Sequence, residues 1–118
     1  MKPTIRDLAA YVPAKDFELS KRFYLALGFT QSEGWGGTAD FELAGSRFRL
    51  QNFYVPEWAN NFMMVMGADD VDGWHRLASE VAREAEFAGV RVGEVEVVGV
   101  SRVLHVVDPS GVLLIFVQ

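Results

Sequence analysis

The chain has 118 residues, of which 50% are hydrophobic and 13% aromatic, a composition that supplies the core of one globular domain. It contains no cysteine, which excludes disulfides and thiolate metal sites. Its formal net charge of −5 argues against nucleic acid as a partner, because phosphate binding needs a basic surface. No apolar run approaches the roughly 20 residues that span a bilayer, and no signal-peptide core is present, so we expect a soluble, cytoplasmic protein.

The first half of the chain predicts one helix embedded among strands. Asp16 is placed to cap this helix, because its side chain can accept a hydrogen bond from the first free N–H groups. Leu19, Phe23 and Leu27 recur every four residues and form an apolar face, and Gly28 is a typical helix end. Strands are expected over residues 4–12, 29–35, 38–43 and 47–53, with a hairpin turn at 44–46.

The second half repeats this order after a connecting loop over residues 54–61. A second helix is capped by Asp70 or Asp72, presents Trp74 and Leu77 on its apolar face, and ends before Gly89. The segment Asp108-Pro-Ser-Gly has the composition of a type I turn. Strands are expected over residues 62–66, 90–100, 101–107 and 112–117. The order strand–helix–three strands therefore occurs twice, which indicates a repeated α+β fold.

Two segments resemble the signatures of the vicinal oxygen chelate superfamily, which includes glyoxalase I, the bleomycin resistance proteins and the extradiol dioxygenases. The first is the helix with its flanks, where Asp16, Ser20, Phe23-Tyr24 and Leu27-Gly28-Phe29 match the pattern. The second is Asp108-Pro-Ser-Gly leading into the last strand. The resemblance implies two paired βαβββ modules forming a cup-shaped mixed sheet, with helices on its outer face. It also implies a homodimer. One domain, 1–118, would contain module one at about 1–55 and module two at about 60–118.

The resemblance further implies where a divalent metal would be held, since several enzymes of the superfamily bind one on matching strands. These positions fall on or near Asp7, and on Gln51, Met63 and Ile115. A thioether is a soft ligand and isoleucine has no donor atom, so a hard or borderline ion would find at most two oxygen ligands. We therefore expect no metal and no cofactor.

The remaining candidates are residues that would line the cup and bind a small molecule. Trp35 and Trp58 could stack on a planar or cationic ligand, and an ion pair between Asp7 and Arg49 would satisfy both charges if the cup is buried. His75 is expected on the helix surface, whereas His105 is either a structural histidine or a polar anchor in the cup. The full set is Asp7, Trp35, Phe41, Arg49, Gln51, Phe53, Trp58, Met63 and His105.

Two functions from different classes follow from the resemblance. The first is a metal-free binding protein for a small organic molecule, similar to drug-sequestering resistance proteins. The alternative is a metal-dependent lyase, isomerase or dioxygenase of the glyoxalase type with non-standard ligands. A dimeric scaffold with a vestigial cup is a third possibility. We favour the binding protein over an enzyme because Met63 and Ile115 occupy ligand positions, and we expect neither nucleic acid nor membrane as a partner.

Overall fold

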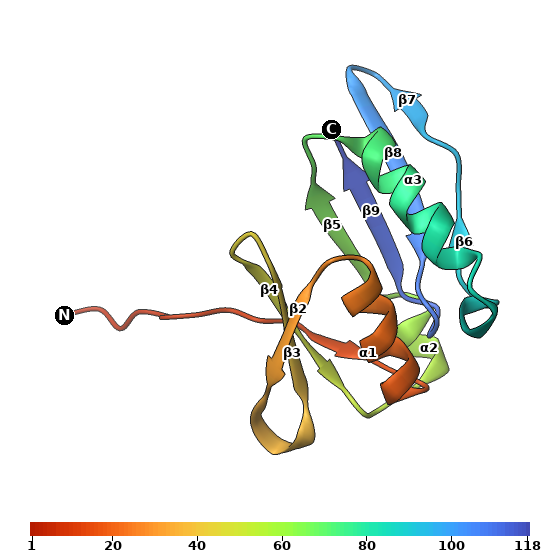
Figure 1. Cartoon of the computed structure of the whole chain (residues 1–118). Helices are drawn as coiled ribbons and strands as arrows, with labels where there is room; N and C mark the ends of the chain where they lie inside the picture. The colour runs from red at the N-terminus through yellow and green to blue at the C-terminus, as the bar shows by residue number, and fades with distance from the viewer.

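Module one contains one helix and four strands in the computed structural model, which describes residues 1–118 (Figure 1). Helix α1 begins after Asp16, whose Oδ1 accepts a hydrogen bond from the backbone N–H of Leu19 at 3.1 Å. The expected cap is therefore confirmed. The elements are β1 (Tyr11–Pro13), α1 (Phe17–Ala26), β2 (Thr30–Glu33), the 3₁₀ turn η1 (Trp35–Gly37), β3 (Ala39–Leu43) and β4 (Ser46–Gln51).

Module two repeats this order after a short linking helix. Asp70 rather than Asp72 caps α3, because its Oδ1 accepts from the backbone N–H of Gly73 at 2.9 Å. The elements are α2 (Pro56–Ala59), β5 (Met63–Gly67), α3 (Val71–Ala82), the 3₁₀ turn η2 (Ala85–Phe87), β6 (Arg91–Val92), β7 (Glu96–Val98), β8 (Ser101–Val107) and β9 (Leu113–Val117).

The strands form two sheets, one in each module, and each sheet carries its own helix (Figure 1). The strand order is β1-β4-β3-β2 in module one and β5-β9-β8-β6 in module two, where β7 also pairs with β8. In both sheets the first and last strands of the module run parallel, and the others are antiparallel. The α+β class with two βαβββ modules is confirmed.

Four details of the sequence-based prediction are wrong. The first strand begins at Tyr11 rather than at residue 4, and the loop over 54–61 contains α2. Helix α3 ends at Ala82, with η2 between it and Gly89. The expected strand over 90–100 is two short strands, β6 and β7.

A hydrophobic core continues from one module into the other beneath the two helices. Tyr24 on α1 makes ring contacts with Phe41 and Phe48 of sheet one, at centroid distances of 5.7 and 4.8 Å. Trp74 on α3 stacks on Phe116 of sheet two at 4.6 Å. Each sheet thus has a helix side that faces the core and an open face on the other side. No helix in the chain combines the length and the apolar character needed to cross a membrane.

Four buried polar residues join the modules and are called here the inter-module clamp: Ser20, Tyr24, Asp108 and Ser110. The Tyr24 hydroxyl donates to Asp108 Oδ2 at 2.6 Å, and Oδ1 accepts from the backbone N–H groups of Ser110 and Val112. The hydroxyls of Ser20 and Ser110 lie 3.2 Å apart. Burial raises the pKa of Asp108 and the pKa of Tyr24. The two segments that carry the family resemblance therefore bind each other directly.

Candidate functional site

The open face of module one carries a row of paired charges. Arg49 on β4 donates to Asp40 on β3 through both Nε, at 2.7 Å from Oδ1, and Nη2, at 3.1 Å from Oδ2. The neighbouring Arg47 binds Asp7 and reaches Asp40 Oδ2 at 3.4 Å. Tyr11 lies beneath Arg49, with the guanidinium carbon 5.6 Å from the ring centroid. Two arginines are thus matched by two carboxylates, so the row has no net charge and presents hydrogen-bonding groups in fixed positions.

The electrostatic effects follow from these contacts. The hydrogen bond from Arg49 holds the pKa of Asp40 below its usual value, and the hydrogen bond from Arg47 does the same for Asp7. The same contacts raise the pKa of both arginines. All four groups therefore remain charged at neutral pH.

The predicted pair between Asp7 and Arg49 is wrong, because Asp7 binds Arg47 and Arg49 binds Asp40. Asp40 was absent from the sequence-based site. The signal was available in the hairpin, since a two-residue turn at Ala44 and Gly45 places Asp40 directly opposite Arg49.

Exposed aromatic side chains gather at one end of the same sheet. Phe53 follows β4 and Trp58 lies on α2, with ring centroids 6.4 Å apart, and their exposed fractions are 53% and 67%. Trp35 in η1, 78% exposed, precedes the end of β3 that pairs with the end of β4. Trp35 therefore lies at this end of the sheet, although only Phe53 and Trp58 form a ring pair. Gln51, the last residue of β4, lies between Arg49 of the charged row and Phe53 of the aromatic end.

The open face of module two is apolar with one histidine on β5, β9 and β8, and the charged residues Arg91 on β6 and Glu96 on β7 lie opposite Val107 and Val103 at its edge. Val65, Ile115 and His105 stand side by side on β5, β9 and β8, as the strand register requires. Met63 and Val65 are 53% and 68% exposed, and His105 is exposed between the half-buried Val103 and Val107. The sequence left the orientation of His105 undecided, and the structure places it on the open face.

Phe41 differs from the other predicted site residues because it is fully buried under α1, where it stacks on Phe48. A ligand on the open face cannot contact it. The residues at the four metal positions do not fit a divalent ion, since Met63 and Ile115 offer no oxygen or nitrogen donor. No three His, Cys, Asp or Glu side chains lie close enough to share an ion.

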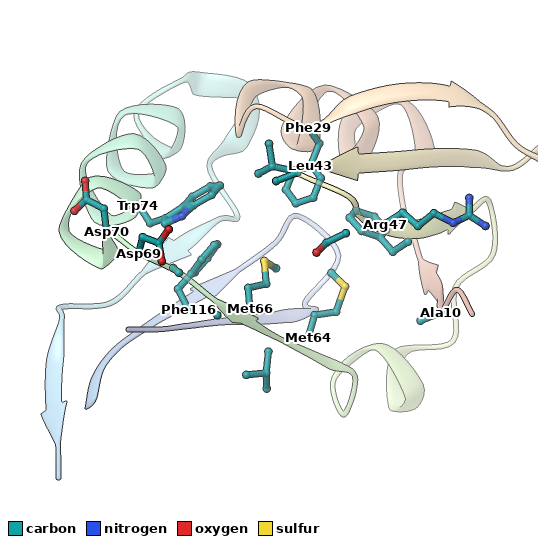
Figure 2. A pocket seen from close by; sticks show the side chains of 16 residues that line it. Ala10, Phe29, Leu43, Arg47, Met64, Met66, Asp69, Asp70, Trp74 and Phe116 are labelled. Carbon is teal, nitrogen blue, oxygen red and sulfur yellow. The ribbon is translucent and has the colours of Figure 1, made fainter. Parts of the chain in front are cut away.

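A groove with a volume of about 650 Å³ separates the helix sides of the two sheets, and it contains none of the nine predicted residues (Figure 2). We call it the inter-module groove. Asp69 and Asp70 lie at one end and Arg47 at the other. Its apolar walls include Phe29, Leu43, Phe48, Met64, Met66 and Phe116. Because both helix sides turn toward this groove, the two open faces turn away from the shared interior.

No family model matches the chain, and no curated protein matches it by sequence. Solved structures do match its fold. A bleomycin resistance determinant encoded on transposon Tn5 has a TM-score of 0.78 and 23% identity, over 97% of this chain and 98% of that one. The bleomycin-binding protein of Streptomyces verticillus, complexed with copper(II)-bleomycin, has a TM-score of 0.76 and 21% identity, over 96% and 97% of the two chains.

The same fold also occurs in an enzyme. Lactoylglutathione lyase from Agrobacterium tumefaciens matches with a TM-score of 0.68 and 16% identity, over 98% of this chain and 94% of that one. These likenesses span nearly the whole length of each protein. The chain therefore has the fold of the glyoxalase and bleomycin resistance proteins, as the resemblance to the vicinal oxygen chelate superfamily predicted.

Proposed function

From a fold that it shares with bleomycin-binding proteins, we propose that this protein binds and sequesters a small organic molecule with a planar portion. The observation that carries the proposal is the exposed ring pair Phe53–Trp58 beside Gln51 and Arg49. Large aromatic side chains that remain exposed on an open sheet face supply stacking surfaces for a ligand ring. Gln51 and the Arg49–Asp40 pair would orient the ligand through hydrogen bonds.

The binding energy that these contacts can supply shows what else the site must contain. Stacking on each ring contributes about 0.5–1.5 kcal/mol beyond area burial, which is far less than the roughly 8 kcal/mol of micromolar binding. Most of the affinity must come from apolar burial, at about 25 cal/mol per Å². One open face can cover only one side of a ligand, whereas drug-sized ligands in binding sites are usually buried by 70–90% or more.

We therefore propose a homodimer in which the open face of module two from a second copy covers the ligand. The centre of that face offers apolar side chains, Met63, Val65 and Ile115, with His105 beside them, and Arg91 and Glu96 lie at its edge. It complements the polar and aromatic face of module one. Of the nine predicted residues only Phe41 is fully buried, which leaves the other eight accessible to a ligand or to a second copy.

The test is a titration followed by intrinsic tryptophan fluorescence, with bleomycin as the first probe and planar aromatic cations and anions after it. Trp58→Ala should weaken binding of a confirmed probe by at least about tenfold, which corresponds to about 1.4 kcal/mol. Gln51→Ala should weaken it less, because it removes a hydrogen bond and little area. Trp35→Ala is the control, since it removes an indole that is 78% exposed, against 67% for Trp58, and that lies outside the ring pair. A probe that bound Trp58→Ala and the parent equally well would place the site elsewhere.

A further inference from the structure

The Arg49 guanidinium on the open face of module one keeps hydrogen-bond donors that no group of the chain uses. It has five N–H groups, of which two bond Asp40 and one bonds the Tyr11 hydroxyl at 3.4 Å. Asp40 occupies the side of the guanidinium formed by Nε and Nη2. One N–H on Nη1 and one on Nη2 therefore remain for a ligand.

Two residues beside Arg49 add further donors. The Tyr11 hydroxyl accepts the hydrogen bond from Arg49, and its own O–H donates to no group of the chain, although the residue is 42% exposed. Gln51, two residues along β4, is half-buried and offers two N–H donors and one carbonyl acceptor. Donors thus outnumber acceptors on this part of the face.

The carboxylate next to these donors is not available to a ligand. Both oxygens of Asp40 accept from Arg49, and Oδ2 also accepts from Arg47 at 3.4 Å. The Asp40 side chain is only 15% exposed. Gly34 packs close to Oδ1, since a Cβ added to this glycine would lie 3.1 Å from that oxygen. A ligand therefore meets the N–H groups of the ion pair rather than its carboxylate.

Glu42 is a carboxylate of the same face without an ion pair, but it lies far from the ring pair Phe53–Trp58. It stands opposite Arg47 on β4, six residues before Phe53, which is about 20 Å in an extended strand. Arg49 is four residues before Phe53, which is about 13 Å. A ligand that stacks on the ring pair and extends along β4 therefore reaches Arg49 before it reaches Glu42.

We propose that the ligand of this protein is an elongated planar molecule with a carboxylate at one end. Its ring stacks on Phe53 and Trp58, and its carboxylate accepts from Nη1 and Nη2 of Arg49 and from the Tyr11 hydroxyl. The two oxygens of a carboxylate match the planar edge of a guanidinium. A cationic group in the same place would bring donors against donors and leave all of them unpaired. This inference rests on the proposed function and names the chemical class of its ligand.

The overall charge of the protein acts in the opposite direction. A net charge of −5 attracts cations at long range, but at 0.15 M salt this attraction is screened beyond about 8 Å. Direct hydrogen bonds to a partly buried guanidinium are screened much less. A preference for an anion therefore cannot come from the net charge and has to come from the donors at Arg49 and Tyr11.

Three probes that share one ring system test the ligand class: anthracene-2-carboxylate, protonated 2-(aminomethyl)anthracene and the uncharged 2-methylanthracene. By equilibrium dialysis at neutral pH and physiological salt, the carboxylate should bind at least about tenfold more tightly than the ammonium compound. Equal affinity of the two, each weakened by Trp58→Ala, would overturn the ligand class and leave the proposed function intact. Failure of all three probes to bind would overturn both.

Substitution of Arg49 tests the contact itself. Arg49→Lys keeps a positive charge beside Asp40 but loses the planar pair of N–H groups. It should weaken anthracene-2-carboxylate by about fivefold or more and leave 2-methylanthracene unchanged, which also reports that the ring site is folded. Arg22→Lys is the matched control, because it changes an arginine paired with Glu86 on helix α1, and it should bind every probe as the parent does.

Tyr11→Phe keeps the proposal testable if Arg49→Lys does not fold. It removes one donor and keeps the ring beneath Arg49, so it should weaken the carboxylate probe and not the uncharged one. If either variant weakened the carboxylate and 2-methylanthracene to the same extent, the proposed contact with the carboxylate would be wrong.

Discussion

Loss of the Tyr24 hydroxyl, one of the hydroxyl groups that join the two modules, should destabilise the protein strongly. Tyr24→Phe removes the donor to Asp108 Oδ2, while the ring keeps its contacts with Phe23, Phe29, Phe41 and Phe48. Tyr24 is fully buried and Asp108 is 1% exposed, so water cannot replace the lost hydrogen bond. The variant therefore isolates one hydrogen bond with almost no change in packed volume.

The magnitude follows from the burial of the acceptor. A buried acceptor left without its donor costs about 1–3 kcal/mol, and an ionised one lies toward the upper end of that range. We expect a loss of about 2–3 kcal/mol in the free energy of unfolding. A small domain has about 5–15 kcal/mol in total, so this is a large fraction of its stability.

The loss should also depend on pH in a defined direction. Burial raises the pKa of Asp108 above the unfolded value of 3.8, so the folded chain holds this proton more tightly than the unfolded chain does. Ionisation of Asp108 therefore lowers stability as the pH rises from that value through the folded pKa. The Tyr24 hydroxyl opposes this shift, and its removal raises the folded pKa further. The loss of unfolding free energy caused by Tyr24→Phe should then be smaller near pH 4 than near pH 7.5. The size of that difference reflects how far the substitution raises the folded pKa of Asp108.

The assay is urea unfolding of parent and variant at equal protein concentration, which keeps any dimer contribution constant. With a typical slope of about 1–3 kcal/mol per M, the midpoint should fall by about 1–3 M at neutral pH. The control is Tyr54→Phe, because Tyr54 is half-buried and contacts Lys15 through its ring. If Tyr24→Phe lost no more stability than Tyr54→Phe, or lost more at acid pH, the account of the clamp would be refuted.

Three further outcomes are expected. Asp40→Asn should lower the free energy of unfolding in urea titrations, because it leaves Arg49 without its carboxylate. Since the pKa of Asp40 is depressed in the fold, the difference in stability between variant and parent should vanish as the pH falls below 3.8. Ala44→Asn should raise stability by up to about 1 kcal/mol in the same titrations, since Ala44 has a φ of 51° before Gly45, where a type I′ turn prefers asparagine. Elemental analysis after dialysis should find no stoichiometric transition metal, with or without added nickel, zinc, manganese or iron. A retained ion with Gln51 as a ligand would contradict the expectation that Ile115, which has no donor atom, excludes a metal site.

The sequence by itself determined the elements whose signals are local. Asp16 and Asp70 cap their helices because a short acidic side chain can reach the N–H groups of its own first turn. The β-branched residues of segment 101–107 predicted β8 with the correct ends, because such side chains pack well on a pleated sheet. The hairpin was predicted with its turn at residues 44–46, but the register that pairs Asp40 with Arg49 was not, because it depends on a turn of only two residues, Ala44 and Gly45.

Only the tertiary structure decided the features that depend on residues far apart in the chain. The pattern of residues 4–12 is that of a strand, yet β1 contains only Tyr11–Pro13. In the parallel register of Tyr11 with Arg49, residues 4–7 lie beyond Ser46, where β4 begins, and so have no strand opposite them. His105 shares its strand with apolar residues on both sides, so only the position of α3 shows which face is open. Tyr24 and Asp108 are 84 residues apart, and their hydrogen bond exists because the core brings α1 against the β8–β9 turn. Local sequence specifies how a segment folds, but burial and pairing are set by what the rest of the chain places beside it.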